Sequence, residues 1–242
     1  MRDYAQEFAG RVAFIRELVK SSGARGIVFG NSGGKDSALV GILCKAACED
    51  TVGVIMPCAS KRNYGQDADD GRALAERFGI ECRVVDLTAV RAAEIAELEK
   101  VCTLNDQALT NLAPRLRMTT LYAIGAAEGR LVAGTGNRSE IHMGYFTKWG
   151  DGASDFNPIA DLTATEVFAF LEYLNAPRSI IDKAPSAGLF DGQTDEAEMG
   201  VSYAAIDRYL FTGEASEHDR AIIDRYHSRS EHKRRPIATY QS

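Results

Sequence analysis

The sequence lacks the features that mark secreted and membrane proteins. Its five cysteines include no C-x-x-C pair, and the N-terminus MRDYAQEFAG is too polar for a signal peptide. No apolar run approaches the roughly 20 residues that cross a bilayer. An odd number of cysteines without a secretory signal is typical of a reducing compartment. We therefore expect a cytoplasmic protein that does not contact a membrane. Cys44 and Cys48, four residues apart on a predicted helix, are expected in the core rather than on a metal.

The sequence also lacks an excess of basic residues over acidic ones. Lys and Arg number 28 against 34 Asp and Glu, which gives a net charge of −6. Proteins that bind duplex nucleic acid usually carry a strong basic excess, so this balance disfavours a nucleic-acid partner. The chain has 242 residues, of which 45% are hydrophobic, and it is long enough to bury a sizeable core.

Short apolar runs alternate with helical patterns through the first half of the chain. This alternation predicts an α/β fold, a Rossmann-like three-layer parallel sheet with helices on both faces. The expected strands are residues 26–30, 51–57, 82–87 and 130–134, and the expected helices are 4–22, 37–48, 66–78, 89–99 and 115–128. Further helices are expected at 162–175, 201–211 and 216–230. Thr163 and Glu166 open the first of these with a capping box.

Residues 30–37, GNSGGKDS, separate the first strand from its helix. They fail the Walker A pattern, because Lys35 stands where its second glycine belongs and Asp36 where its Ser or Thr belongs. They match S-G-G-x-D-S, the pyrophosphate loop of enzymes that split ATP between its α and β phosphates. Glycines allow backbone N–H groups to face a phosphate, and the following helix N-terminus adds positive charge. We expect ATP contacts from the whole loop: Gly30, Asn31, Ser32, Gly33, Gly34, Lys35, Asp36 and Ser37.

Asp36 would repel phosphate unless a cation lay between them, so it is predicted to bind Mg²⁺. The alternative is a polar turn in which Asp36 only caps the helix. Two other stretches, Met56–Pro57 and Gly134–Glu140, also follow strands, and ligands bind at the carboxyl ends of parallel strands. Residues 134–158 show little periodicity, and long irregular stretches in compact domains are usually functional.

Several motifs together resemble one family. SGGKDS, NLAPRLRM, GTGNRSE, GYFTKWGDG, PSAGLFDGQTDE and EHKRRP occur in the order and spacing of the ammonia-dependent NAD⁺ synthetases, over roughly residues 5–236. The resemblance implies an N-type ATP pyrophosphatase with an adenine nucleotide α-hydrolase-like fold. Such enzymes adenylate the nicotinate carboxylate of deamido-NAD⁺ with ATP, and ammonia then displaces AMP. It also implies a symmetric homodimer. Because glutamine-using relatives carry an additional amidase domain, we expect one synthetase domain over residues 1–242 and no glutaminase domain.

The resemblance also assigns residues to roles. For ATP it implies Met56, Thr135 and Ser186 in addition to the loop, with Asp36 and Glu140 on the metal. For deamido-NAD⁺ it implies Arg115, Lys148, Asp155, His232 and Lys233. Asp36, Lys148 and Asp151 are the expected catalytic residues, with Asp151 handling a proton during ammonia attack. Without the resemblance, Glu140 reads as a solvated loop acid and HKRR as a solvated basic tail.

The chain departs from the family pattern at two positions. Ala164 stands where the family often has a phosphate-contacting lysine, and Lys35 is a candidate to replace that charge. Pro114 precedes Arg115 where a small helix former is usual, although proline can open a helix. Two other functions remain open at this point. One is a pyrophosphate-loop enzyme that thiolates tRNA, which the acidic balance and the lack of C-x-x-C disfavour. The other is a non-catalytic nucleotide sensor on the same fold.

Overall fold

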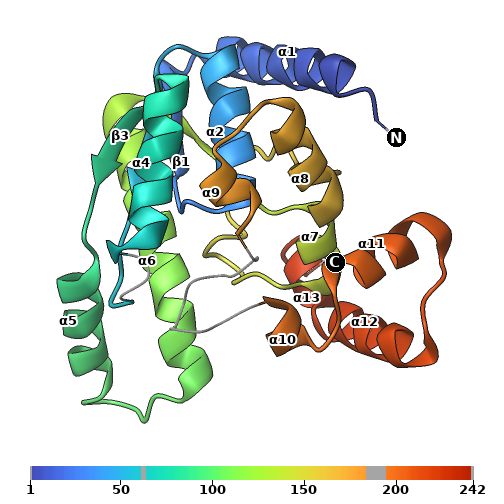
Figure 1. Ribbon diagram of the computed structural model, residues 1–242. Helices are drawn as coiled ribbons and strands as arrows, with labels where there is room; N and C mark the ends of the chain where they lie inside the picture. Colours follow the sequence, from blue (N-terminus) through green and yellow to red (C-terminus); the bar gives the residue numbers. More distant parts are fainter. Residues whose placement is uncertain (1, 61–63, 184–194, 241–242) are drawn as a thin grey trace.

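A parallel sheet of four strands forms the centre of the molecule (Figure 1). The computed structural model describes residues 2–60, 64–183 and 195–240. The strands are β1 (Gly26–Gly30), β2 (Thr51–Ile55), β3 (Glu81–Val84) and β4 (Arg130–Ala133), in the order β3-β2-β1-β4. In the register of the ladder, Ile27 pairs with both Thr51 and Leu131. The predicted strand–helix alternation is confirmed, although β2 and β3 end before the predicted residues 57 and 87.

Helices cover both faces of the sheet because its strands are apolar on both sides. In β1, Ile27 and Phe29 point into one core and Val28 points into the other. Successive side chains of a strand point to opposite faces, which explains this division. Helices α1 (Tyr4–Ser22), α2 (Lys35–Ala47) and α4 (Gln66–Phe78) contribute to the first core, and α6 (Asp106–Glu128) covers the second, with α5 (Thr88–Leu98) packed beside it. The three-layer prediction is confirmed.

A second group of helices follows β4, and several of its members pack around a small core of their own, whereas others pack on the first core (Figure 1). Its helices are α7 (Arg138–Met143), α8 (Ala164–Tyr173), α9 (Arg178–Ile181), α10 (Asp195–Met199), α11 (Tyr203–Thr212), α12 (Glu217–Arg229) and α13 (Glu231–Arg234). Met143, Tyr203, Ile206 and Ile223 are among the buried residues of this core. Helix α8 also packs on α2, which joins the group to the sheet. The capping box at Thr163 and Glu166 is present as predicted.

Two sequence expectations were wrong in this region. The helix expected from residue 115 begins at Asp106, where the side chain of Asn105 accepts a hydrogen bond from the N–H of Ala108. Pro114 therefore lies inside α6 rather than opening it. It is buried at the edge of the pocket, beside Gly150, and the helix continues through it although proline removes one backbone hydrogen bond. Residues 134–158 are also not wholly irregular, because they include α7.

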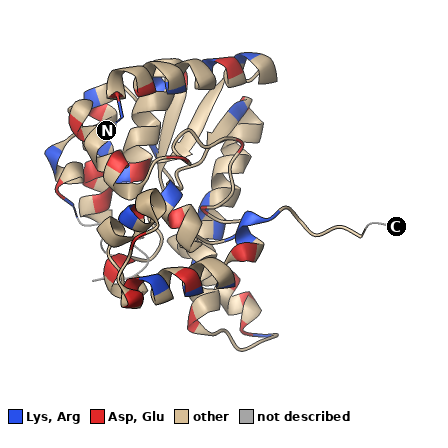
Figure 2. Ribbon diagram, turned by 90° about the vertical axis from the view of Figure 1, so that its right-hand side faces the viewer, with Lys and Arg blue, Asp and Glu red and all other residues tan. Residues whose placement is uncertain are grey.

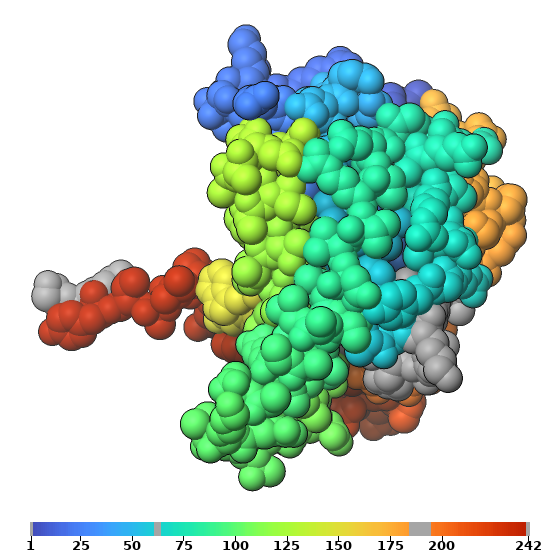
Figure 3. All heavy atoms as spheres, turned by 90° about the vertical axis from the view of Figure 1, so that its left-hand side faces the viewer, coloured from blue at the N-terminus to red at the C-terminus, as the bar shows by residue number. Residues whose placement is uncertain are grey.

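The segment after α13 extends away from the rest of the molecule, as Figure 2 and Figure 3 show from opposite sides. Ile237 is 68% exposed and Tyr240 is 93% exposed. Among the described helices, none combines the length and apolar character that a membrane span requires. Cys44 is fully buried and Cys48 packs against the same core, as predicted.

Candidate active site

The pyrophosphate loop lies between the end of β1 and the first turn of α2. Gly33 has a φ of +69°, and a Cβ there would lie 2.1 Å from the carbonyl oxygen of Asp67, so only glycine is accommodated. Helix α2 begins after Gly34, which offers no side-chain cap, and its first N–H groups face the loop. The hydroxyls of Ser32 and Ser37 lie 3.0 Å apart beside them. The loop therefore presents hydroxyls and a helix N-terminus to an anion.

Buried polar groups hold this loop against α4. Lys183 Nζ lies 2.6 Å from Oδ1 of Asp67 and 2.7 Å from Oδ2 of Asp70, and it donates a 3.3 Å hydrogen bond to the carbonyl of Gly33. Asn31, predicted as an ATP contact, donates its side-chain amide to the carbonyl of Gly71 at 2.8 Å. The side chain of Asn31 therefore positions the loop, although the residue lines the pocket.

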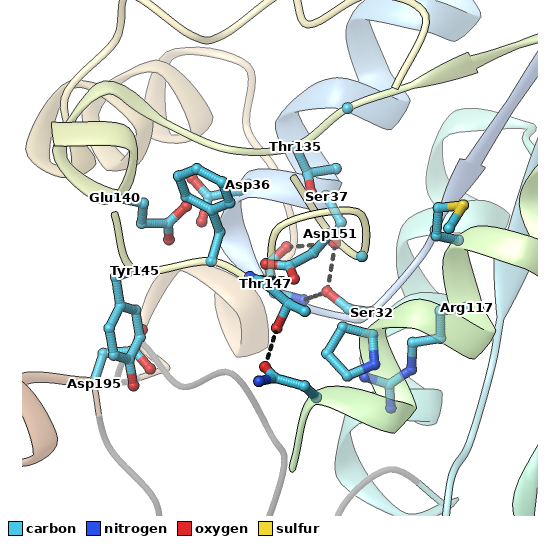
Figure 4. Close-up of a pocket in the computed structure, with 18 of the residues that line it drawn as sticks. Ser32, Asp36, Ser37, Arg117, Thr135, Glu140, Tyr145, Thr147, Asp151 and Asp195 are labelled. Atoms are coloured by element: carbon cyan, nitrogen blue, oxygen red, sulfur yellow. Dashed lines mark hydrogen bonds between the residues drawn. The ribbon is translucent and has the colours of Figure 1, made fainter. Parts of the chain in front are cut away.

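Asp36 and Glu140, the predicted metal ligands, come together from the first turns of two helices, α2 and α7 (Figure 4). Asn137 fixes both of them. Its side-chain amide donates to Oδ1 of Asp36 at 3.0 Å, and its backbone N–H donates to Oε2 of Glu140 at 3.2 Å. Asn137 and Glu140 form the capping box of α7. Glu140 is thus a positioned, largely buried acid rather than a solvated loop acid.

The ammonium of Lys35 lies between these carboxylates. Its Nζ is 2.5 Å from Oδ2 of Asp36 and 3.7 Å from Oε1 of Glu140. Burial alone lowers the pKa of a lysine, but the two carboxylates outweigh it and raise the pKa of Lys35. Burial and the neighbouring Asp36 together raise the pKa of Glu140. The two acids thus repel each other, and a cation between them stabilises both in the charged form.

These residues suit Mg²⁺. This ion is usually held by one or two carboxylates together with waters and substrate phosphates, rather than by a cage made wholly of protein. Asp36 and Glu140 supply two carboxylates beside a phosphate-binding loop, and Lys35 is a stand-in cation between them. Among the described residues, no cluster of three His, Cys, Asp or Glu side chains forms a metal cage. The donor set fits an ion that arrives with a nucleotide.

A pocket of about 900 Å³ extends from the loop across the carboxyl ends of the strands. Besides the loop, it is lined by the predicted residues Met56, Arg115, Thr135, Glu140, Lys148, Asp151, His232 and Lys233. This volume lies near the upper end of the range for ligand sites, which suits nucleotides. Figure 4 shows Asp36 and Glu140 on one side of the pocket and Arg117 on the other.

Basic residues from three segments meet away from the loop. Arg115 Nη2 donates to the carbonyl of Lys148 at 3.5 Å, and Lys148 Nζ donates to the carbonyl of His232 at 2.7 Å. Lys233 Nζ donates to the carbonyls of Gly144 and Phe146, at 2.7 and 2.6 Å. The first part of EHKRRP, in α13, is therefore folded against the site and is not a free basic tail.

Asp151 lies at the centre of the pocket (Figure 4). Its Oδ1 accepts a 2.9 Å hydrogen bond from the N–H of Thr147. The side chain is accessible from the pocket but surrounded by protein, and this desolvation raises its pKa despite the nearby Lys233 and Arg117. A carboxylate in this setting is a suitable proton acceptor.

Of the predicted residues that the structure describes, Gly33 and Asp155 do not line the pocket. Gly33 belongs to the loop but lies against the backbone of Asp67. Asp155 lies beside β4, where its Oδ2 accepts a 2.7 Å hydrogen bond from the N–H of Val132 and its Oδ1 accepts one of 3.3 Å from Tyr122. It is not among the lining residues. Ser186 lies outside the described residues.

Comparison with known proteins identifies the family. The profile described as NAD synthase matches residues 7–241. The chain belongs to this family. The "NH(3)-dependent NAD(+) synthetase" of Carboxydothermus hydrogenoformans is 47% identical over 227 residues, 93% of this chain and 92% of that protein. Two solved structures match the whole chain over their full length. An "NMN synthetase" from Francisella tularensis has a TM-score of 0.95 and 36% identity. The NH3-dependent NAD synthetase from Campylobacter jejuni has a TM-score of 0.80 and 30% identity.

Sequence reasoning missed three residues that shape this NAD synthase site. Asn137 lies within the quoted GTGNRSE motif, and its N-x-x-E spacing to Glu140 is a recognisable capping signal. Arg117 is two residues beyond Arg115 and donates to the carbonyl of Met56 at 3.1 Å. Lys183 precedes the PSAGLFDGQTDE motif and carried no signal of its own, because its partners are over 100 residues away.

Proposed function

We propose that this protein amidates the nicotinate carboxylate of deamido-NAD⁺ with ammonia, consuming ATP and releasing AMP and pyrophosphate. The observation that supports this most directly is the common pocket. This pocket contains a pyrophosphate loop with two positioned carboxylates, and the basic groups of Arg115, Lys148 and Lys233 line the same pocket. The 47% identity to a synthetase named for this activity supports the substrate class.

In the first step the nicotinate carboxylate attacks the α-phosphorus of ATP and expels pyrophosphate. The loop of Ser32 to Ser37 and the N-terminus of α2 bind the departing phosphates. Asp36 and Glu140 would hold Mg²⁺, which supplies charge that stabilises the pyrophosphate as it leaves. The product is an acyl adenylate, in which AMP has become the leaving group of an otherwise unreactive carboxylate.

In the second step ammonia attacks the acyl carbon, AMP departs, and the nitrogen loses a proton. Asp151 is proposed to accept that proton, because its carboxylate faces the pocket and its pKa is raised. Lys148 is proposed to orient the nicotinate carboxylate beside it. Arg115, His232 and Lys233 are assigned to the remainder of the dinucleotide, and Ser186 to an ATP phosphate.

Free ammonia is the proposed nitrogen donor, and residues 1–242 are proposed to act as one synthetase domain in the cytoplasm. We also propose a homodimer. In this dimer, Asp155 of one copy contacts the deamido-NAD⁺ bound by the other copy, at the side of the sheet where the two copies meet. Phe14 on α1 is 48% exposed, and Ala123, Ala126 and Ala127 are exposed on α6. Tyr4 and Phe8, in contrast, pack on the core of their own chain, so they are not available to a second copy.

A second substrate has specific support. The similarity to an NMN synthetase, with a TM-score of 0.95, exceeds the 0.80 obtained for an NAD synthetase. An enzyme that makes NMN by this chemistry amidates nicotinate mononucleotide, which shares the reacting carboxylate with deamido-NAD⁺. The tRNA-thiolating alternative is not favoured. In Figure 2 acidic and basic residues are interspersed along the helices rather than gathered on one basic surface.

One assay separates these activities. Purified protein is incubated with ATP, Mg²⁺ and ammonia, and with either deamido-NAD⁺ or nicotinate mononucleotide, and AMP and the amidated product are measured. We expect a higher kcat/KM for deamido-NAD⁺. A preference for the mononucleotide would support the second substrate, and no AMP from either would refute the proposed amidation. Glutamine in place of ammonia is expected to give no turnover.

A further inference from the structure

Lys35 faces the metal ligands rather than open solvent. It is the first residue of α2, and its side chain is 6% exposed. Asn137 holds Oδ1 of Asp36 and Oε2 of Glu140. The other oxygen of each carboxylate, Oδ2 and Oε1, faces the Lys35 ammonium at 2.5 and 3.7 Å. The ammonium thus lies against the oxygens that are not already engaged by Asn137.

Two aromatic rings also lie near this ammonium. Lys35 Nζ lies 5.3 Å from the ring centroid of Tyr203 on α11 and 5.8 Å from that of Phe168 on α8. Rings at this distance stabilise a cation while excluding water. The carboxylates of Asp36 and Glu140 compensate this buried ammonium for the hydration that it loses.

We propose that Lys35 is an internal placeholder for the divalent cation. In the nucleotide-free enzyme its ammonium neutralises Asp36 and Glu140. When metal and ATP bind together, the ammonium leaves the carboxylates and pairs with the phosphates. The inference rests on the proposed function only in naming ATP as the nucleotide.

The physical reason is competition between cations. Mg²⁺ binds carboxylate oxygens at about 2.0–2.1 Å, so an ion on Oδ2 of Asp36 and an ammonium at the same oxygen would lie within a few ångströms of each other. Like charges this close repel strongly in a partly desolvated site. Free metal should therefore bind weakly. Metal that arrives with a nucleotide binds well, because the phosphates give the ammonium a new partner. This is positive coupling between two ligands.

The direct test measures metal binding without nucleotide. Titration calorimetry with Mn²⁺ or Mg²⁺ alone compares the wild type with Lys35→Met, which keeps most of the unbranched side chain and removes its charge. We expect the variant to bind metal at least about tenfold more tightly. Equal or weaker binding by a folded variant would overturn the proposal. Lys35→Gln provides a second neutral variant if the Met variant is unstable.

Lys45 gives a matched control on the same helix. Its Nζ also pairs with a carboxylate, lying 2.5 Å from Oε1 of Glu49, but this pair is remote from the pocket lining. Lys45→Met should leave metal affinity unchanged. If Lys45→Met tightened metal binding as much as Lys35→Met, the effect would come from net charge alone. The proposal that Lys35 is a placeholder would then be wrong.

A measurement on the wild type avoids substitutions altogether. Crystal structures are determined without ligand and with Mn²⁺ plus the α,β-methylene analogue of ATP. We expect Nζ of Lys35 to withdraw from Oδ2 of Asp36 in the second structure, and an unchanged contact with metal bound would refute the inference. Neither experiment uses the amidation reaction. If the wild type failed to amidate deamido-NAD⁺ but loss of Lys35 still tightened metal binding, only the proposed function would be refuted.

Discussion

The side-chain amide of Asn137 donates a 3.0 Å hydrogen bond to Asp36, from which it is separated by 101 residues. The parallel sheet makes this contact possible, because β1 and β4 are adjacent and the loops that follow them meet at the same edge. The same residue caps α7 and so fixes Glu140. The two carboxylates are therefore preorganised by one neutral side chain before any ligand binds.

Asn137→Ser separates the two tasks of this residue. Serine still caps a helix but does not reach Asp36, so we expect unchanged thermal stability and a loss of activity on the order of 10-fold, with a higher Mg²⁺ requirement. Asn137→Ala removes the cap as well, and should also lower the free energy of unfolding by about 1 kcal/mol. Steady-state assays over a Mg²⁺ series and thermal melts provide the measurements. Full activity of the Ser variant at low Mg²⁺ would show that the contact with Asp36 is not needed.

Asp36→Asn and Glu140→Gln should each abolish pyrophosphate release while leaving the fold intact. Each removes one negative charge from the proposed metal site, and loss of such electrostatic stabilisation lowers the rate on the order of 10²-fold or more. Pyrophosphate release at ordinary Mg²⁺ is the readout, with circular dichroism as the control for folding. A near-normal rate from either variant would remove that residue from the site.

The sequence predicted the sheet and the loop, and most of the residues it assigned to the site do line the pocket, because strands, glycines and motif spacing are local signals. It did not predict how Asn31 or Lys35 would be used. Both belong to GNSGGKDS, yet one side chain turns toward α4 and the other toward Glu140, and only the packed structure decides such directions. Ala164 stands where the family often has a phosphate-contacting lysine. That Lys35 supplies the missing charge stays a prediction.

Helix boundaries were less predictable where packing outweighs local preference. Pro114 indicated a helix start, but the buried residues around it, Leu112 and Ala113, hold α6 continuous through the proline. Asp155 illustrates a different limit. Its motif position suggested a ligand contact, whereas its place beside β4 depends on a pairing between Ala133 and Phe156 that no local pattern encodes.

Lys183→Met should weaken both the fold and the binding of ATP. The substitution leaves Asp67 and Asp70 without the cation they share, and breaking a buried ion pair typically lowers stability by about 3 kcal/mol. It also frees the carbonyl of Gly33, so the KM for ATP should rise. The control is Arg178→Ala, whose ion pairs with Glu172 and Asp182 are exposed and should contribute under about 1 kcal/mol. Urea unfolding measures the stability lost in each variant. Similar losses in both would contradict the assigned role of Lys183.

Acid should destabilise the protein through His142. Burial, together with His227 and Arg234, lowers the pKa of His142 to about 4 from 6.5. Below pH 6.5 the unfolded chain takes up a proton that the folded chain accepts only near pH 4. Stability is therefore complete above pH 6.5 and is lost as the pH falls toward 4, by up to about 3 kcal/mol.

His142→Phe tests this linkage. The ring stacks on His227 at a centroid distance of 4.1 Å, and its Nε2 has no hydrogen-bond partner within the described parts of the chain, so phenylalanine should be tolerated. We expect a flatter dependence of unfolding free energy on pH between 6.5 and 4. The same substitution at the exposed His218 should leave the slope unchanged. A slope unaltered by His142→Phe would assign the acid sensitivity to other groups.

The proposed dimer makes the last prediction. The outer side of α6 exposes Ala123, Ala126 and Ala127, small residues that allow close approach of a helix from a second copy across a two-fold axis. Light scattering at micromolar concentration should give about twice the chain mass of 26.3 kDa. Ala123→Glu should yield monomers, because it places a charge in the contact, whereas Ala92→Glu on the exposed side of α5 should not. Since Asp155 lies outside the pocket of its own chain, the monomeric variant should also show a raised KM for deamido-NAD⁺. A wild-type mass near that of one chain, persisting with deamido-NAD⁺ present, would refute both the dimer and the shared site.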